Sequence, residues 1–140
     1  MTHVRIVHLA GRLTALANQR IAERLEREGL VGLLPAHGDL LVHLFTEDAL
    51  TVSELARRTH RTKSTVSVLA GKLERPGYIE RRRREDDQRA LAVSLTDAGR
   101  ALESVFEEVS EDLDARLSAA LTDDQRQRLE ELLEKAMSAF

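Results

Sequence analysis

The middle of the sequence carries side chains that could bind a polyanion. Four consecutive arginines stand at Arg81, Arg82, Arg83 and Arg84, and Arg89 follows after a short acidic segment. Guanidinium groups form paired hydrogen bonds with phosphate oxygens, so a cluster of them is typical of a surface that binds nucleic acid. The alternative interpretation is a charged face that is only solvated.

A second group of candidate side chains lies upstream, on a predicted helix that begins after Thr62. Its buried side is marked by apolar residues at steps of three and four, namely Val66, Leu69, Ala70 and Leu73. The other side and its borders carry Lys63, Ser64, Thr65, Ser67, Val68 and Lys72. Hydroxyl groups and a valine methyl group can reach base edges in the major groove of DNA, whereas the lysines suit phosphates. The alternative is an exposed helix face that binds nothing.

Charge is distributed along the chain in a way that favours one cationic surface. The net charge is −3, yet residues 54–96 hold 11 basic and six acidic side chains. Residues 97–140 hold five basic and 12 acidic side chains, and residues 1–53 are close to neutral. This pattern predicts a cationic region that faces a polyanion and an acidic remainder.

Several other kinds of chemistry lack the residues they need. The sequence has no cysteine, which excludes thiolate nucleophiles and thiolate zinc sites. It has no Gly-x-Ser-x-Gly elbow, glycine-rich phosphate loop or His-Glu-x-x-His helix, so we expect no enzyme activity and no cofactor. No two histidines stand three or four residues apart, so no metal site is predicted; they are His3, His8, His37, His43 and His60. A secretory signal and an 18-residue apolar run are both missing, and we expect a cytoplasmic protein.

The elements that must position the candidate residues are mostly helices. Apolar spacing predicts a helix over 4–28 that ends at Gly29, and a second one from Pro35 to about Thr46. Short helices follow at 52–59 and from Thr62 to about Glu74, and long ones after Thr96 and after Thr122. Thr51 and Glu54 have the spacing of a capping box. The expected fold class is mainly α, with a two-stranded β hairpin.

The predicted hairpin lies between the last short helix and the long helix after Thr96. Pro76 and Gly77 end the preceding helix abruptly, and an extended run begins at Tyr78. Residues 85–88 are expected to form a polar turn, and residues 91–95 alternate with a period of two. The arginine run therefore falls on the first arm and the tip. Since side chains alternate across a strand, the arginines should point to both faces unless they lie beyond the strand's end.

The order of helices and hairpin is that of a winged helix-turn-helix, and specific motifs support this. Asp87, Gln88 and Arg89 are followed by Leu95, Thr96 and Gly99, which match an Asp-x-Arg wing tip and a Leu-Thr-x-x-Gly helix start. Residues 51–99 thereby resemble the MarR family of bacterial transcriptional regulators. The resemblance implies that Arg89 enters the minor groove and that Asp87 orients it. The alternative is that the two residues only pair across a tight turn. His60 stands where many such turns have glycine.

The resemblance also implies a domain organisation and an oligomeric state. We expect one chain over 1–140, a DNA-binding region over 35–96, and dimerisation helices over 1–30 and 97–140. The apolar stripes of the outer helices exceed what the central region can cover, so a homodimer is predicted. The alternative is a monomer whose terminal helices fold back on its own core.

Resembling proteins often hold a small aromatic or anionic effector between the dimerisation helices and the DNA-binding region. Candidate lining residues in this sequence are Leu9, Arg12, Leu13, His37, Leu41, His43 and Leu44. The alternative for each of them is ordinary core or surface. The expected function is a homodimeric regulator, acting as a repressor, that binds a near-palindromic operator in double-stranded DNA. The competing hypothesis is a winged-helix module that binds proteins, since a fold does not fix a function.

Overall fold

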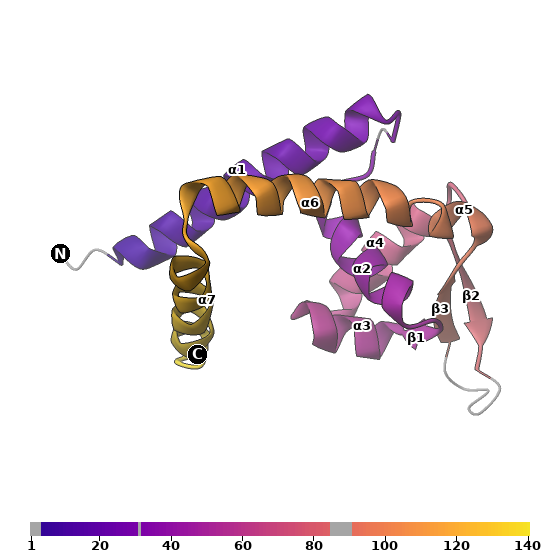
Figure 1. Ribbon diagram of the computed structural model, residues 1–140. Coiled ribbons are helices and arrows are strands. Elements are labelled where there is room, and N and C mark those ends of the chain that lie inside the picture. Colours follow the sequence, from indigo (N-terminus) through magenta and orange to yellow (C-terminus); the bar gives the residue numbers. More distant parts are fainter. Residues whose placement is uncertain (1–3, 31, 85–90) are drawn as a thin grey trace. The chain divides into compact units, whose positions relative to one another are not determined.

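The computed structural model describes residues 4–30, 32–84 and 91–140. Its helices are α1 (Arg5–Arg27), α2 (Pro35–Thr46), α3 (Val52–Thr59), α4 (Lys63–Glu74), α5 (Asp97–Arg100), α6 (Glu103–Ala120) and α7 (Asp123–Met137). Its strands are β1 (Leu50–Thr51), β2 (Ile79–Arg83) and β3 (Leu91–Leu95) (Figure 1). The chain forms two compact units, Met1–Phe106 and Glu107–Phe140. The predicted fold class is confirmed.

Local side-chain and backbone interactions define the helix ends. At the end of α1, Gly29 adopts a φ of 76°, and the Leu30 N–H donates to the Leu25 carbonyl oxygen at 2.9 Å. This is the Schellman arrangement that a glycine at this point predicts. At the start of α3, the Glu54 N–H donates to Thr51 Oγ1 at 3.1 Å and the Thr51 N–H donates to Glu54 Oε2 at 2.8 Å. The predicted capping box is confirmed.

The core of the first unit lies where α2, α3 and α4 meet the sheet. Leucines from four helices and two strand residues are fully or almost fully buried: Leu25, Leu40, Leu41, Leu44, Leu55, Leu73, Ile79 and Val93. Phe106 covers this core and lies 5.9 Å from Phe45, centroid to centroid. Each such side chain contributes roughly 1.5–3 kcal/mol by leaving water, so the core fixes α4 against the strands.

The sheet has three strands, whereas the sequence predicted two. The order is β1-β3-β2 and all pairs are antiparallel, with Leu50 opposite Val93 and Arg81 opposite Val93 on the other side. In Figure 1, β1 lies beside the β2–β3 hairpin, at the start of α3. A two-residue strand is too short to leave an alternating pattern, so β1 could not be predicted. The β2–β3 hairpin is called the wing below.

The helix expected after Thr96 is interrupted, which corrects the prediction of one long helix. Thr96 Oγ1 accepts a hydrogen bond from the Gly99 N–H at 3.1 Å and donates to the Gly77 carbonyl oxygen. The Leu102 N–H then donates to the Gly99 carbonyl oxygen, three residues back, before α6 begins. The physical reason is local, because the tightened bond from Leu102 to the residue three back ends α5, and apolar spacing does not reveal it.

The second unit is a pair of helices joined near Thr122. Thr122 and Gln125 form a capping box at the start of α7, with distances of 3.0 and 3.2 Å. Arg126 of α7 donates to Ser118 Oγ of α6 at 2.6 Å and is ion-paired with Asp114. Throughout the described ranges, no helix has the length and apolar composition that a bilayer crossing requires.

Candidate nucleic-acid interface

Helix α4 presents a small, polar and cationic face. Its buried side is formed by Val66, Leu69, Ala70 and Leu73, as the spacing predicted. All six residues predicted on the other side are exposed: Lys63, Ser64, Thr65, Ser67, Val68 and Lys72. Short hydroxyl side chains leave room for the helix backbone to approach a groove, and lysines at both ends can meet phosphates.

The turn before α4 sets the angle between α3 and α4. His60 adopts the left-handed conformation, with φ of 53° and ψ of 41°, which histidine tolerates better than most side chains. Arg61 donates its N–H to the Ala56 carbonyl oxygen at 3.0 Å and places its guanidinium 2.7 Å from Asp39 of α2. Thr62 Oγ1 then caps α4 by accepting from the Thr65 N–H at 3.1 Å. The turn is therefore tied to α2 and to the start of α4.

Two of the four arginines point back onto the helices. Arg81 Nε lies 2.9 Å from Glu74 Oε2, and its Nη2 donates to the Ser67 carbonyl oxygen at 3.2 Å. Arg84 Nη1 lies 3.0 Å from Glu54 Oε1, at the start of α3. Strand alternation predicted that the run would point to both faces, and Glu74 of α4 and Glu54 of α3 are the partners of the two arginines that turn inward.

The other two arginines of the run are more exposed. Arg82 is 72% exposed and its Nη2 lies 2.7 Å from Glu80 Oε1 on the same strand, and Arg83 is also exposed. Asp87 and Arg89, the predicted wing-tip pair, lie outside the described residues. The four arginines of the run thus lie on one strand, β2, and just beyond its end.

Glu54 links the wing to the capping box of α3. The pKa of its carboxyl group is lowered, chiefly because it accepts the Thr51 N–H and also because the Arg84 guanidinium lies beside it, while partial burial opposes the shift. One carboxylate therefore holds both a helix start and a wing arginine, and only its ionised form does both well.

His37 is a buried histidine at the start of α2. It is 1% exposed, and its Nδ1 accepts the Leu34 N–H at 2.8 Å. Within the described residues its Nε2 has no hydrogen-bond partner. Burial lowers the pKa of the imidazole, and the positive charge of Lys72 lowers it further. The folded protein therefore favours neutral His37.

Acid should weaken the fold through His37. The unfolded chain binds this proton near pH 6.5, whereas the folded chain binds it only at lower pH. The contribution of neutral His37 to the free energy of unfolding is therefore fully present above pH 6.5. Below pH 6.5 it falls by up to about 1.4 kcal/mol per pH unit, until the lowered pKa is reached.

Urea unfolding at pH 7.5 and at pH 5 measures this loss. The difference in free energy of unfolding between the two pH values should be smaller for His37→Gln than for wild type. His8→Gln, at an exposed site on α1, should retain the wild-type difference, and an equal loss of acid sensitivity in both variants would contradict this role.

The residues predicted to line an effector site fall in different environments. Leu41 and Leu44 are completely buried in the core with His37, whereas Leu9 and Leu13 are about half exposed. Arg12 is exposed as well, and His43 is partly exposed on α2. An effector site built from these seven residues stays a prediction.

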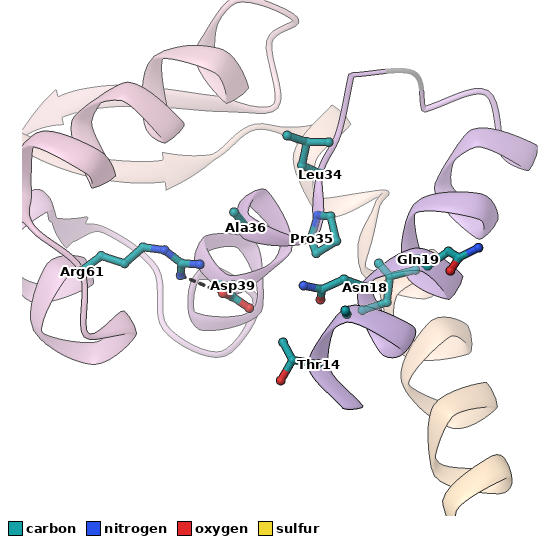
Figure 2. Close-up of a pocket in the computed structure, with 10 residues that line it drawn as sticks. Thr14, Asn18, Gln19, Leu34, Pro35, Ala36, Asp39 and Arg61 are labelled. Atoms are coloured by element: carbon teal, nitrogen blue, oxygen red, sulfur yellow. Dashed lines mark hydrogen bonds and ion pairs between the residues drawn. The ribbon is translucent and has the colours of Figure 1, made fainter. Parts of the chain in front are cut away.

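A pocket of about 650 Å³ lies between α1 and the start of α2 (Figure 2). None of the seven predicted residues lines it. Its lining residues are Thr14, Ala15, Asn18, Gln19, Ile21, Leu34, Pro35, Ala36, Asp39 and Arg61. Figure 2 shows the Arg61–Asp39 ion pair at one side of the pocket and the Asn18 amide near its middle. Arg61 and Asp39 are 22 residues apart, so no sequence pattern could have joined them.

Several known proteins are similar to this chain in sequence or in fold. A model of the MarR family matches residues 31–90. The solved structure of the Staphylococcus aureus MepR–DNA complex superposes with a TM-score of 0.86 at 25% identity, covering 100% of this chain and 99% of that one. The central region of this chain, residues 31–90, therefore matches the MarR family. The resemblance predicted from the wing motifs and the helix start at Thr96 is confirmed.

Two further known proteins are similar to this chain. The HTH-type transcriptional regulator SarZ of Staphylococcus aureus (strain USA300) is 34% identical over 71 residues, which are 51% of this chain and 48% of SarZ. The chain thus spans about half the length of the curated relatives it matches. A MarR regulator from Methanosarcina mazei Go1 has a TM-score of 0.82 at 24% identity, over 98% of this chain and 96% of that one, and shows the shared fold.

Proposed function

We propose that this chain is a homodimeric transcriptional regulator that binds specific double-stranded DNA through residues 35–96. The observation that carries the proposal is the exposed polar and cationic face of α4 directly beside the arginine-bearing strand β2, to which Arg81 joins it. The relatives support it, because SarZ is described as a transcriptional regulator and MepR was solved as a DNA complex.

The expected docking places α4 in the major groove and the wing along the adjacent backbone. A twofold axis would present two copies of α4 to a near-palindromic operator, with half-sites about 10 bp apart or a small multiple of that. Ser64, Ser67 and Val68 would face base edges, and Lys63 and Lys72 would meet phosphates. Binding over a promoter would make the protein a repressor, because it would exclude the transcription machinery from that site.

One observation favours the competing hypothesis of a protein-binding module. Arg81, Arg82 and Arg84 are each ion-paired with a carboxylate of the same chain, which reduces the positive charge available to phosphates. Partner proteins would be recognised by the shape of this surface more than by its charge. The two functions differ in how binding depends on salt.

Salt dependence should decide between them. We expect the full chain to select duplexes from fragments of its source genome, and log Kd for a selected duplex to change by about 0.9 per log unit of salt for each phosphate neutralised. Lys63→Gln and Lys72→Gln should each reduce this slope by about one. Lys135→Gln, on exposed α7, is the matched control and should leave the slope unchanged. No duplex retention at low salt, or a flat response, would favour the protein-binding module.

We also propose that a small anionic effector releases the DNA by binding in the pocket between α1 and α2. Arg61 lines this pocket and immediately precedes Thr62, the residue that caps α4. A carboxylate that competed with Asp39 for Arg61 would therefore act on the start of α4. Benzoate, added to the duplex-retention assay, should lower retention of wild type, and unchanged retention at millimolar benzoate would remove this effector class from the proposal.

A further inference from the structure

We propose that Arg81 is a positioning residue, which locks the wing to α4 and so determines DNA specificity, and not a phosphate ligand. This inference rests on the proposed function. It assigns different roles to two neighbouring arginines of the same strand. Arg81 sets the geometry of the interface, while Arg82 remains open to the duplex.

The contacts of Arg81 span two turns of α4. Its Nε lies 2.9 Å from the Glu74 carboxylate at the end of the helix, and its Nη2 donates to the carbonyl oxygen of Ser67 at 3.2 Å. Ser67 and Glu74 are seven residues apart, so they lie on one side of the helix. Within the described residues, the Glu74 contact is an ion pair and not a hydrogen bond, whereas the Ser67 contact is a hydrogen bond. A planar guanidinium can make both contacts at once because its charge is spread over three nitrogens, which a lysine ammonium on its flexible stem does less well.

The position of Arg81 on β2 explains why it turns inward. Side chains alternate across a strand, so Arg81 shares a face with Ile79, which is only 2% exposed. The Arg81 side chain is 27% exposed, against 72% for Arg82 on the opposite face. A partly buried guanidinium that already has a carboxylate and a carbonyl partner would have to give up both to reach a phosphate. Among the described residues, Arg82 is ion-paired with Glu80 of its own strand, whose side chain is 40% exposed.

Arg81 contacts the backbone of α4 on the exposed side of the helix that is expected to face the DNA bases. Ser67 is one of the residues expected to face base edges, and its carbonyl oxygen is the one that Arg81 contacts. Fixing the Ser67 carbonyl group relative to β2 fixes the angle between α4, which would lie in the major groove, and the wing, which would lie along the DNA backbone. Loss of Arg81 should therefore impair the simultaneous fit of both elements to a correct sequence, whereas Lys63 and Lys72 would still bind any duplex.

The experiment compares a duplex selected by wild type with a scrambled duplex of the same length and composition. For each variant, Kd for both duplexes is measured over a salt series, and thermal unfolding checks the fold. The variants are Arg81→Gln, the matched control Arg82→Gln, and the charge swap Arg81→Glu with Glu74→Arg. Arg81→Lys serves as the reference if Arg81→Gln does not fold.

A positioning role for Arg81 predicts how each variant changes the two affinities and the salt slope. Arg81→Gln should lower the ratio of selected to scrambled affinity by about fivefold to tenfold with an unchanged salt slope, because it removes fit and not a phosphate contact. Arg82→Gln should lower both affinities alike and reduce the slope. The charge swap should recover part of the ratio, since it restores an ion pair between β2 and α4.

A phosphate contact predicts the opposite pattern and would overturn the inference. Arg81→Gln would then lower both affinities equally and reduce the slope by about one, and the swap would bind worse still because the carboxylate introduced on β2 would face a phosphate. An Arg81→Gln protein that binds like wild type would overturn it as well. If wild type itself fails to distinguish the two duplexes, the proposed function fails and not this assignment alone.

Discussion

Replacing Leu9 and Leu13 together by glutamate is expected to convert the protein to monomers and to weaken binding of a palindromic duplex by more than about 100-fold, because the two half-sites are then no longer bound together. Both leucines lie on a stripe of α1 with Ile6 and Leu16, and these four side chains are 46–67% exposed. An apolar stripe this exposed is stable in water only when another surface covers it, and a second copy of α1 can cover it symmetrically.

The measurement is sedimentation equilibrium followed by duplex titration. Because both leucines are exposed in the single chain, circular dichroism should show that the helices persist in the variant. Val42→Glu is the control, since Val42 is an apolar residue of α2 with 49% exposure that lies outside the stripe. A Leu9→Glu, Leu13→Glu protein that still sediments as a dimer would place the dimer interface elsewhere in the chain.

Helix boundaries could be predicted from the sequence because the interactions that set them are local. The bonds between Thr51 and Glu54, and between Thr62 and the Thr65 N–H, join residues three apart. Gly29 and Gly77 both have positive φ, as their places at helix ends predicted. Such local contacts require particular residue types at a fixed spacing, and this spacing can be recognised in the sequence.

Contacts between distant residues could not be predicted in the same way. Strand β1 exists because Leu50 and Thr51 meet β3 some 40 residues later, and the hydrogen bond from Thr96 to Gly77 joins residues 19 apart. The sequence indicated that the arginine run would be cationic, but not that the carboxylates of Glu54 and Glu74 would hold two of its members. Residue types predict a surface, whereas the orientation of each side chain depends on partners that only the fold supplies.

The expected effector residues show a related difficulty. Helical periodicity identified the apolar side of α2 correctly, since Leu41 and Leu44 are buried. It could not distinguish a side that fills the core from one that lines a cavity, because both are apolar. The pocket that the structure does contain is lined partly by polar residues of α1 with no pattern of their own, such as Thr14, Asn18 and Gln19.

Gly99→Ala is expected to destabilise the fold by about 3 kcal/mol, because it forces a methyl group into packed backbone. A Cβ at Gly99 would overlap the Tyr78 carbonyl oxygen and lie 3.0 Å from Leu95 Cδ2. The same carbonyl oxygen accepts the Thr96 N–H at 3.1 Å, so any shift that relieves the overlap also disturbs the junction between wing and α5.

The same substitution at Gly71 of α4 is the control, and it should have the opposite sign. A Cβ there meets nothing within 4 Å, so Gly71→Ala should stabilise the helix by up to about 1 kcal/mol through helix propensity alone. Urea unfolding at pH 7.5 measures both changes. Equal stabilities for Gly99→Ala and wild type would show that the packing of Gly99 against the Tyr78 carbonyl group is loose. The wing would then be held to the helices chiefly by β1 and by the ion pairs of Arg81 and Arg84.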